Sequence, residues 1–161
     1  MRFIGRIQIG GLTLVPPEGA RGRRVILSLN AAAAAIPTLV GKPLRILHKG
    51  QAGNSVIGRI TEANIDDKWL MFSAELDRGI PEFAKGYGLS WEIEVAYIEN
   101  PALTRVWKVY RIGAFGGIAL VDRPAAREQE WKVEGEWTYK ESLIGLARRV
   151  VGHWRKKKEP R

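Results

Sequence analysis

The chain has 161 residues, 45% of them hydrophobic, which is enough for one domain with a core and too few for two of ordinary size. It has no cysteine and only two histidines, which excludes disulfides, thiolate metal sites and a cysteine nucleophile, and we expect neither a metal nor a cofactor. The net charge of +9 is uneven, because residues 148–161 hold seven bases and one acid and so carry six of the nine charges.

The first part of the chain predicts strands joined by loops. Residues 2–9 alternate imperfectly between apolar and polar, which predicts a strand, and Gly10-Gly11 predicts a turn before a short strand at 12–15. Charges interrupt the opening apolar run and no small-residue cleavage site follows, so we expect no secretory signal. No apolar stretch reaches about 18 residues, so we expect a soluble protein made in a cytoplasm, with no membrane span.

A second strand and a helix are expected next. Residues 18–24 are rich in glycine and arginine and predict a loop, and residues 24–29 predict a strand. The helix is expected from about 31 to 40, with Asn30 as its N-cap because an asparagine side chain accepts from an orphan backbone N–H. A run of alanines favours the helix, and Pro37 predicts a kink.

From residue 43 the pattern becomes β. Strands are expected near residues 43–48, 56–64, 68–76, 88–97, 104–112 and 116–122. Asp66-Asp67 is typical of a tight turn, so the second and third of these should form a hairpin, and residues 80–85 predict one helical turn. Many strands with few helices favour a closed or nearly closed antiparallel sheet.

The C-terminal part differs in charge. Residues 129–139 alternate like a strand, whereas residues 143–154 place apolar side chains on one helical face. We therefore expect a β domain over residues 1–139 and a basic amphipathic helix and tail over 140–161. The bases there attract polyanions, and nucleic acid is one expected partner through Arg148, Arg149, Arg155, Lys156, Lys157 and Lys158.

Two segments about forty residues apart carry chemistry. The first, LVGKPLRILH, ends at His48 and is followed by IGRI at 57–60; the second, GYGLSWEI, contains Ser90. Nucleophilic acyl transfer by serine requires at least a histidine near the serine, since the imidazole takes the hydroxyl proton as the oxygen attacks. A third segment, GIALVDRPA at 117–125, completes the pattern.

In this order and spacing, the three segments resemble the phage prohead (head maturation) proteases, relatives of the herpesvirus assemblin serine proteases. The resemblance covers roughly residues 30 to 126. It implies a mainly β (α+β) fold, an antiparallel β-barrel of about six to eight strands flanked by a few helices. It also implies that His48 is the general base and Ser90 the nucleophile, and that the loop at 18–24 borders the substrate cleft.

The third catalytic position departs from the family pattern. Many relatives have an acid or a histidine where this chain has Gly117, which has no side chain to orient His48. Three interpretations stay open: a Ser–His dyad helped by water, an acid from elsewhere, or a relative that has lost activity. Glu92 and Glu94 share a face with Ser90 if that strand is regular, and Asp122 is another candidate.

Other residues have supporting or rival roles. An acyl-transfer site needs donors for the developing oxyanion, and the resemblance points to an arginine region where this chain has Arg123 and Arg127. Solvated surface arginines are the alternative, more so for Arg127. Ser55 is a rival nucleophile within a turn signal, and His153 is expected to be a surface residue.

The first functional hypothesis is a serine endopeptidase of virus head maturation. Its expected partners are scaffold and major capsid protein, with the enzyme itself a further substrate, inside the viral prohead in the host cytoplasm. Assemblin-type enzymes often act as homodimers, and the helix at 141–154 is a candidate contact. The alternative hypothesis is a non-catalytic basic β-barrel that binds nucleic acid, or a degenerate protease that acts as a scaffold.

Overall fold

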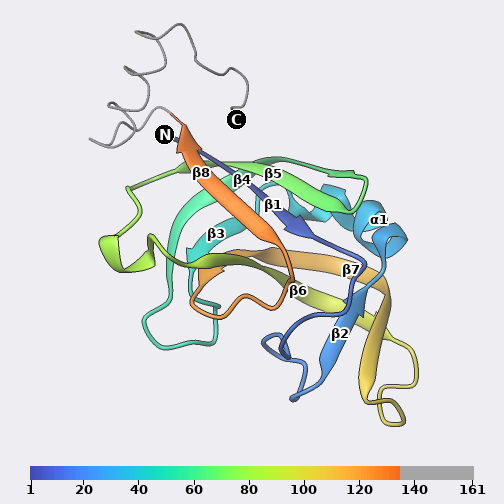
Figure 1. Cartoon of the computed structure of the whole chain (residues 1–161). Helices are drawn as coiled ribbons and strands as arrows, with labels where there is room; N and C mark the ends of the chain where they lie inside the picture. Colours follow the sequence, from blue (N-terminus) through green and yellow to red (C-terminus); the bar gives the residue numbers. More distant parts are fainter. Residues whose placement is uncertain (135–161) are drawn as a thin grey trace, which may run out of the picture.

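The computed structural model describes residues 1–134 (Figure 1). The elements in chain order are β1 (Arg2–Gln8), β2 (Arg24–Leu27), α1 (Leu29–Leu39), β3 (Pro43–Ile46), β4 (Ser55–Asp66), β5 (Trp69–Leu76), a 3₁₀ turn η1 (Glu82–Ala84), β6 (Gly88–Ile98), β7 (Val106–Val121) and β8 (Gln129–Glu134). The expected helix at 143–154, the end of the strand at 129–139, the domain boundary at 139/140, His153 and the six C-terminal bases lie outside the described residues.

The described part is mainly β, as expected, but the sheet differs from the expected one. The strand order is β2-β7-β3-β4-β5-β1-β8, with β6 paired to β7. Both β2 and β3 run parallel to β7, whereas β6 runs antiparallel to it. The expectation of an antiparallel barrel is therefore corrected to a mixed sheet whose strand pairing does not close. The physical reason is α1, because a helix between β2 and β3 permits two parallel strands on one edge of β7.

The strand β7 pairs with three other strands, β2, β3 and β6. The sequence predicts two strands, at 104–112 and 116–122, but the structure has one strand from Val106 to Val121. This strand contains Gly113, Gly116 and Gly117, and β6 stays paired through the region by a series of register shifts. Figure 1 shows β6 and β7 running together across the molecule, with α1 to one side.

The helix α1 packs on the middle of β7, where neither β2 nor β3 reaches. The Thr38 hydroxyl accepts a hydrogen bond from the Phe115 amide at 3.0 Å, and the Lys42 ammonium donates to the Phe115 carbonyl at 2.8 Å. The N-cap is Ser28 rather than the expected Asn30, since the Ser28 hydroxyl accepts from the Ala31 amide. Asn30 lies inside the helix, two residues after the N-cap.

The remaining strand predictions agree well with the structure. β4 and β5 form the expected antiparallel hairpin, and the apolar face of β5 is buried, comprising Leu70, Phe72, Ala74 and Leu76. The short strand expected at 12–15 is wrong: that segment has an isolated bridge from Leu12 to Ile26 in place of a strand. Within residues 1–134, no helix is both long enough and apolar enough to cross a membrane.

Candidate active site

His48 lies two residues beyond β3, and hydrogen bonds on both sides of it in the chain fix its backbone. The amide of Leu47, a residue with φ of +63°, donates to the Leu120 carbonyl of β7 at 2.8 Å. The His48 amide donates to the Gln51 side-chain oxygen at 2.7 Å, and the Gln51 amide donates back to the His48 carbonyl at 2.8 Å. These bonds fix the point from which the imidazole projects.

Ser90 lies on β6, on the opposite edge of β7 from β3. Ala119 of β7 is the cross-strand partner of Ser90 on one side and of Arg45 on the other. Gly117, two residues earlier on β7, is the partner of Glu92. Because the central strand presents only alanine and glycine at these positions, the longer side chains of the two flanking strands meet above it.

The three side chains that meet are Ser90, His48 and Glu92. The His48 Nε2 atom lies 3.1 Å from the Ser90 hydroxyl oxygen, and the His48 Nδ1 atom lies 3.0 Å from a Glu92 carboxylate oxygen. An ionised carboxylate only accepts, so the Nδ1 proton is donated to Glu92. The Nε2 lone pair then faces Ser90, whose hydroxyl donates to it. This is the hydrogen-bond order that nucleophilic serine catalysis requires.

Glu92 is bound by three donors. One carboxylate oxygen accepts from the Arg45 guanidinium at 3.2 Å, and the other accepts from the His48 ring and from the Lys49 amide at 3.2 Å. Burial raises the pKa of Glu92, but the hydrogen bond and charge of His48, followed by the Arg45 and Lys49 donors, outweigh burial and leave the pKa below its ordinary value. Glu92 is therefore held as a carboxylate in the geometry that orients the imidazole.

Gly117 makes room for this carboxylate. A Cβ atom at position 117 would lie 2.5 Å from the Pro43 carbonyl oxygen and 3.0 Å from a Glu92 carboxylate oxygen. The residue also has φ of +147°, at a point where the β6–β7 register shifts. Many of the prohead proteases that this chain resembles have an acid or a histidine at this position, whereas Gly117 has no side chain. The Glu92 carboxylate lies next to Gly117 and bonds to the histidine instead.

The other acidic candidates do not reach the histidine. The register shift directly after Glu92 breaks the regular alternation that would place Glu94 beside it, and Glu94 is exposed. Asp122 is also exposed, in the segment after β7. Among the described residues, neither Glu94 nor Asp122 has a hydrogen bond to His48; the carboxylate that does is that of Glu92.

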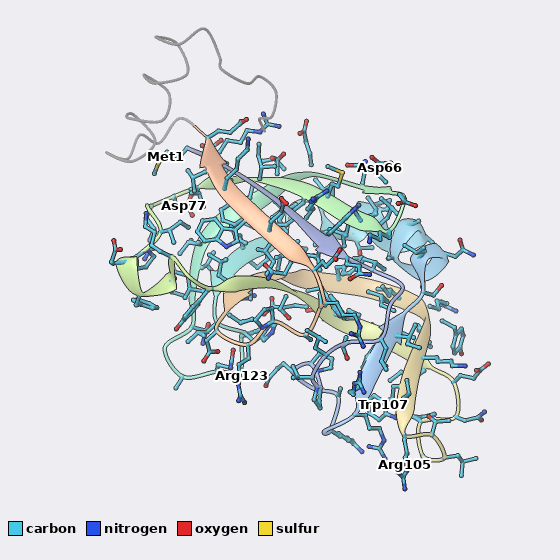
Figure 2. All side chains as sticks on the ribbon, in the orientation of Figure 1. Met1, Asp66, Asp77, Arg105, Trp107 and Arg123 are labelled. Atoms are coloured by element: carbon cyan, nitrogen blue, oxygen red, sulfur yellow. The ribbon has the colours of Figure 1, made fainter. Side chains whose placement is uncertain are left out.

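The two arginines expected near an oxyanion are on the surface. Arg123 is exposed, and Figure 2 shows it at the lower edge of the molecule with its side chain directed outward. Arg127 is exposed and donates to the Leu12 carbonyl at 3.0 Å. Ser55, the rival nucleophile, begins β4, while both ring nitrogens of His48 are bonded to Ser90 and Glu92.

Sequence reasoning missed Arg45. Its side chain and that of Glu92 are each only 12% exposed, so they form a largely buried ion pair beside the histidine. The signal in the sequence is a charged residue inside the apolar strand run that ends at His48. A charge in that setting needs a partner, and the partner is supplied by β6.

A cavity of about 390 Å³ borders this group. Its lining includes Arg45, His48 and Glu92, the loop that runs through Glu18 and Gly19, and an apolar wall from β2, β6 and β7. The loop predicted to border a cleft is therefore at the cavity. Ser90 is only 2% exposed and is not part of the lining.

Compared with protein-family models, with curated proteins and with solved structures, the chain shows no match to any of them. Within residues 1–134, no group of three or more histidine, aspartate or glutamate side chains is placed to hold a metal ion.

Proposed function

We propose that this chain is a serine endopeptidase of virus head maturation, with Ser90 as nucleophile, His48 as general base and Glu92 as the residue that orients the histidine. The observation that carries the proposal is the continuous hydrogen-bond chain from Ser90 through both ring nitrogens of His48 to Glu92, at 3.1 and 3.0 Å. The resemblance to prohead proteases implies two of these residues, His48 and Ser90.

The proposed reaction is acyl transfer to serine. The Ser90 oxygen attacks a peptide carbonyl carbon while its proton passes to His48 Nε2. Glu92 holds the Nδ1 proton and stabilises the imidazolium that forms. His48 then gives its proton to the leaving amine, which leaves an acyl group on Ser90. Water, deprotonated by His48, releases the acyl group as a carboxylic acid and restores the serine.

The viral part of the proposal depends on the resemblance of the three sequence segments to prohead proteases. On this basis the substrates are scaffold and major capsid protein, and the enzyme itself, within a prohead in the host cytoplasm. The finer fold proposal is an assemblin-like arrangement; the eight strands and the flanking helix of residues 1–134 support it, although two strands are parallel to β7 and the sheet does not close. Homodimerisation belongs to the same proposal, whereas nucleic-acid binding through the basic C-terminal residues belongs to the alternative, a non-catalytic binding module.

One observation favours a second candidate function, a degenerate protease that acts as a scaffold or binding module. Ser90 is 2% exposed and His48 7%, so a substrate carbonyl reaches the serine only if neighbouring groups move. A protein that has kept the hydrogen-bond chain for stability alone would look the same.

The deciding experiment is co-expression with the neighbouring scaffold or capsid protein, followed by intact mass analysis, for wild type, Ser90→Ala and Ser55→Ala. The protease proposal expects cleavage by wild type and Ser55→Ala and none by Ser90→Ala. In parallel, a small fluorophosphonate should add its mass to Ser90 in the purified wild type. Absence of both cleavage and labelling would favour the scaffold function.

A further inference from the structure

The cavity beside His48 has an apolar wall made by three strands. The lining residues that form it are Val25, Trp91, Ile93, Ala96, Ile98, Trp107 and Val109. Trp107 is held rigidly, since its indole N–H donates to the Pro101 carbonyl at 2.8 Å and the Arg23 guanidinium lies 5.0 Å from the ring centroid. Figure 2 labels Trp107 beside β2 and β7, in the lower part of the molecule.

The polar groups of the cavity are either already paired or at its edge. Arg45 and Glu92 bond to each other, and both ring nitrogens of His48 are occupied. The remaining charged lining residues, Glu18, Lys49 and Glu94, are exposed to solvent. A ligand that enters therefore finds apolar surface rather than an unpaired buried charge.

The cavity is large enough for one bulky substrate side chain and lies beside the proposed nucleophile. Its volume is at the lower end of the range of roughly 300–1,000 Å³ typical of small-molecule sites. The β6 part of the lining runs from Trp91, next to Ser90, as far as Ile98. With about 3.3 Å per residue along a strand, its near end is one residue from the nucleophile and the rest extends away from it.

We infer that this cavity binds a large apolar side chain, aromatic or branched aliphatic, of a polypeptide substrate, at a residue a few positions from the bond that Ser90 attacks. The inference rests on the proposed function for its link to cleavage, but the binding itself does not require catalysis. The binding free energy comes from burial of apolar area, so it should be more favourable for a phenylalanine or leucine side chain than for alanine.

Binding is measured on the full chain with single-residue probes. N-acetyl-phenylalaninamide, N-acetyl-leucinamide, N-acetyl-alaninamide and N-acetyl-argininamide are titrated separately, and the indole N–H resonances of Trp91 and Trp107 are followed by NMR. We expect saturable shifts with the phenylalanine and leucine probes and an affinity at least about tenfold weaker for the alanine probe.

A cavity-filling variant tests the location. Ala96→Trp places an indole in the lining and should weaken the phenylalanine probe by about tenfold or more. Val95→Trp, the next residue on the same strand, exposed and outside the lining, is the matched control and should leave affinity unchanged. A further variant, Ile98→Ala, enlarges the cavity and should raise the preference for phenylalanine over leucine, which keeps the test available if Ala96→Trp does not fold.

Several results would overturn the inference: equal affinity for the alanine probe, tightest binding of the argininamide, no saturable shift at either tryptophan, or unchanged affinity in both Ala96→Trp and Ile98→Ala. Labelling of Ser90 by a small fluorophosphonate, measured on the same samples, separates the two proposals. Labelling without probe binding retains the protease and removes the apolar site. Probe binding without labelling, together with absence of cleavage in the co-expression experiment, retains the apolar site and removes the protease.

Discussion

Gly117 and Glu92 are cross-strand partners, and a Cβ atom on Gly117 would lie 3.0 Å from a carboxylate oxygen of Glu92. The carboxylate of Glu92 can therefore take its position beside His48 only because residue 117 has no side chain. Any residue with a side chain at 117 would compete with Glu92 for the same space and with the Pro43 carbonyl for its Cβ position. Because Gly117 has no side chain, there is space for the carboxylate of Glu92, on the neighbouring strand β6, to reach His48.

Gly117→Ala should destabilise the fold and disrupt the site together. The new Cβ would lie 2.5 Å from the Pro43 oxygen, at a φ of +147° that non-glycine residues rarely adopt, so we expect a loss of about 1–3 kcal/mol in the free energy of unfolding. Urea denaturation measures this loss. The matched control is Gly116→Ala, whose Cβ would make ordinary contacts of 3.6 Å or more. Equal effects of the two changes would contradict the steric argument.

Under the proposed serine mechanism, Glu92→Gln should keep the shape of the site but lower the rate of acyl transfer. A glutamine can donate as well as accept, so it no longer fixes the Nδ1 proton and does not stabilise the imidazolium. We expect the rate of Ser90 labelling or of substrate cleavage to fall by about 10²–10⁴-fold. Glu94→Gln, two residues away and exposed, should stay close to wild type. A strong effect of Glu94→Gln with little effect of Glu92→Gln would reverse the assignment.

Arg45→Gln should cost more stability than removal of a surface ion pair. Arg45 donates to Glu92 with both side chains 12% exposed, and we expect a loss of about 1.5–3 kcal/mol, as for hydrogen bonds to charged groups. The control is Arg6→Gln, whose pair with Glu130 has side chains 40% and 60% exposed, for which about 0–1 kcal/mol is expected. Unfolding in urea at neutral pH compares them, and a larger loss for Arg6→Gln would count against the buried pair.

Stability should fall in acid partly because of Glu92. Burial alone would raise its pKa, but His48, Arg45 and the Lys49 amide bring it below 4.5, the ordinary value. A folded-state pKa below the unfolded one means that ionised Glu92 stabilises the fold above about pH 4.5 and that this contribution disappears as the pH falls through the folded-state pKa.

The measurement is the urea midpoint at pH 7 and at about pH 3. The drop between the two should be smaller in Glu92→Gln than in wild type, because the variant has no carboxylate there to protonate. Glu94→Gln, which removes an exposed carboxylate of the same strand, should show the wild-type drop. An equal drop in wild type and Glu92→Gln would show that the contacts of Glu92 do not contribute to stability.

Local signals in the sequence determined most elements of the described chain. Alternation predicted β1, β3, β5 and β6 to within a few residues, and the Asp66-Asp67 turn predicted the β4–β5 hairpin. These elements depend on side-chain alternation and turn chemistry over a few neighbouring residues. His48 and Ser90 were singled out differently, by the resemblance of three sequence segments to the prohead proteases.

Tertiary structure decided how the strands pair. Continuity of β7 through its three glycines depends on β6, which remains paired along it, and the parallel placement of β2 and β3 depends on α1 packing across the strand between them. Both are contacts between residues far apart in the chain, so no local pattern carries them.

The third member of the hydrogen-bond chain shows the same division. Alternation put Glu92 and Glu94 on one face with Ser90, and the sequence by itself went no further. The register shift after Glu92 and the small residues Ala119 and Gly117 decided between the two, because only Glu92 comes within 3.0 Å of His48 across β7. Sequence supplied the chemical groups, and the cross-strand register selected which of them meet.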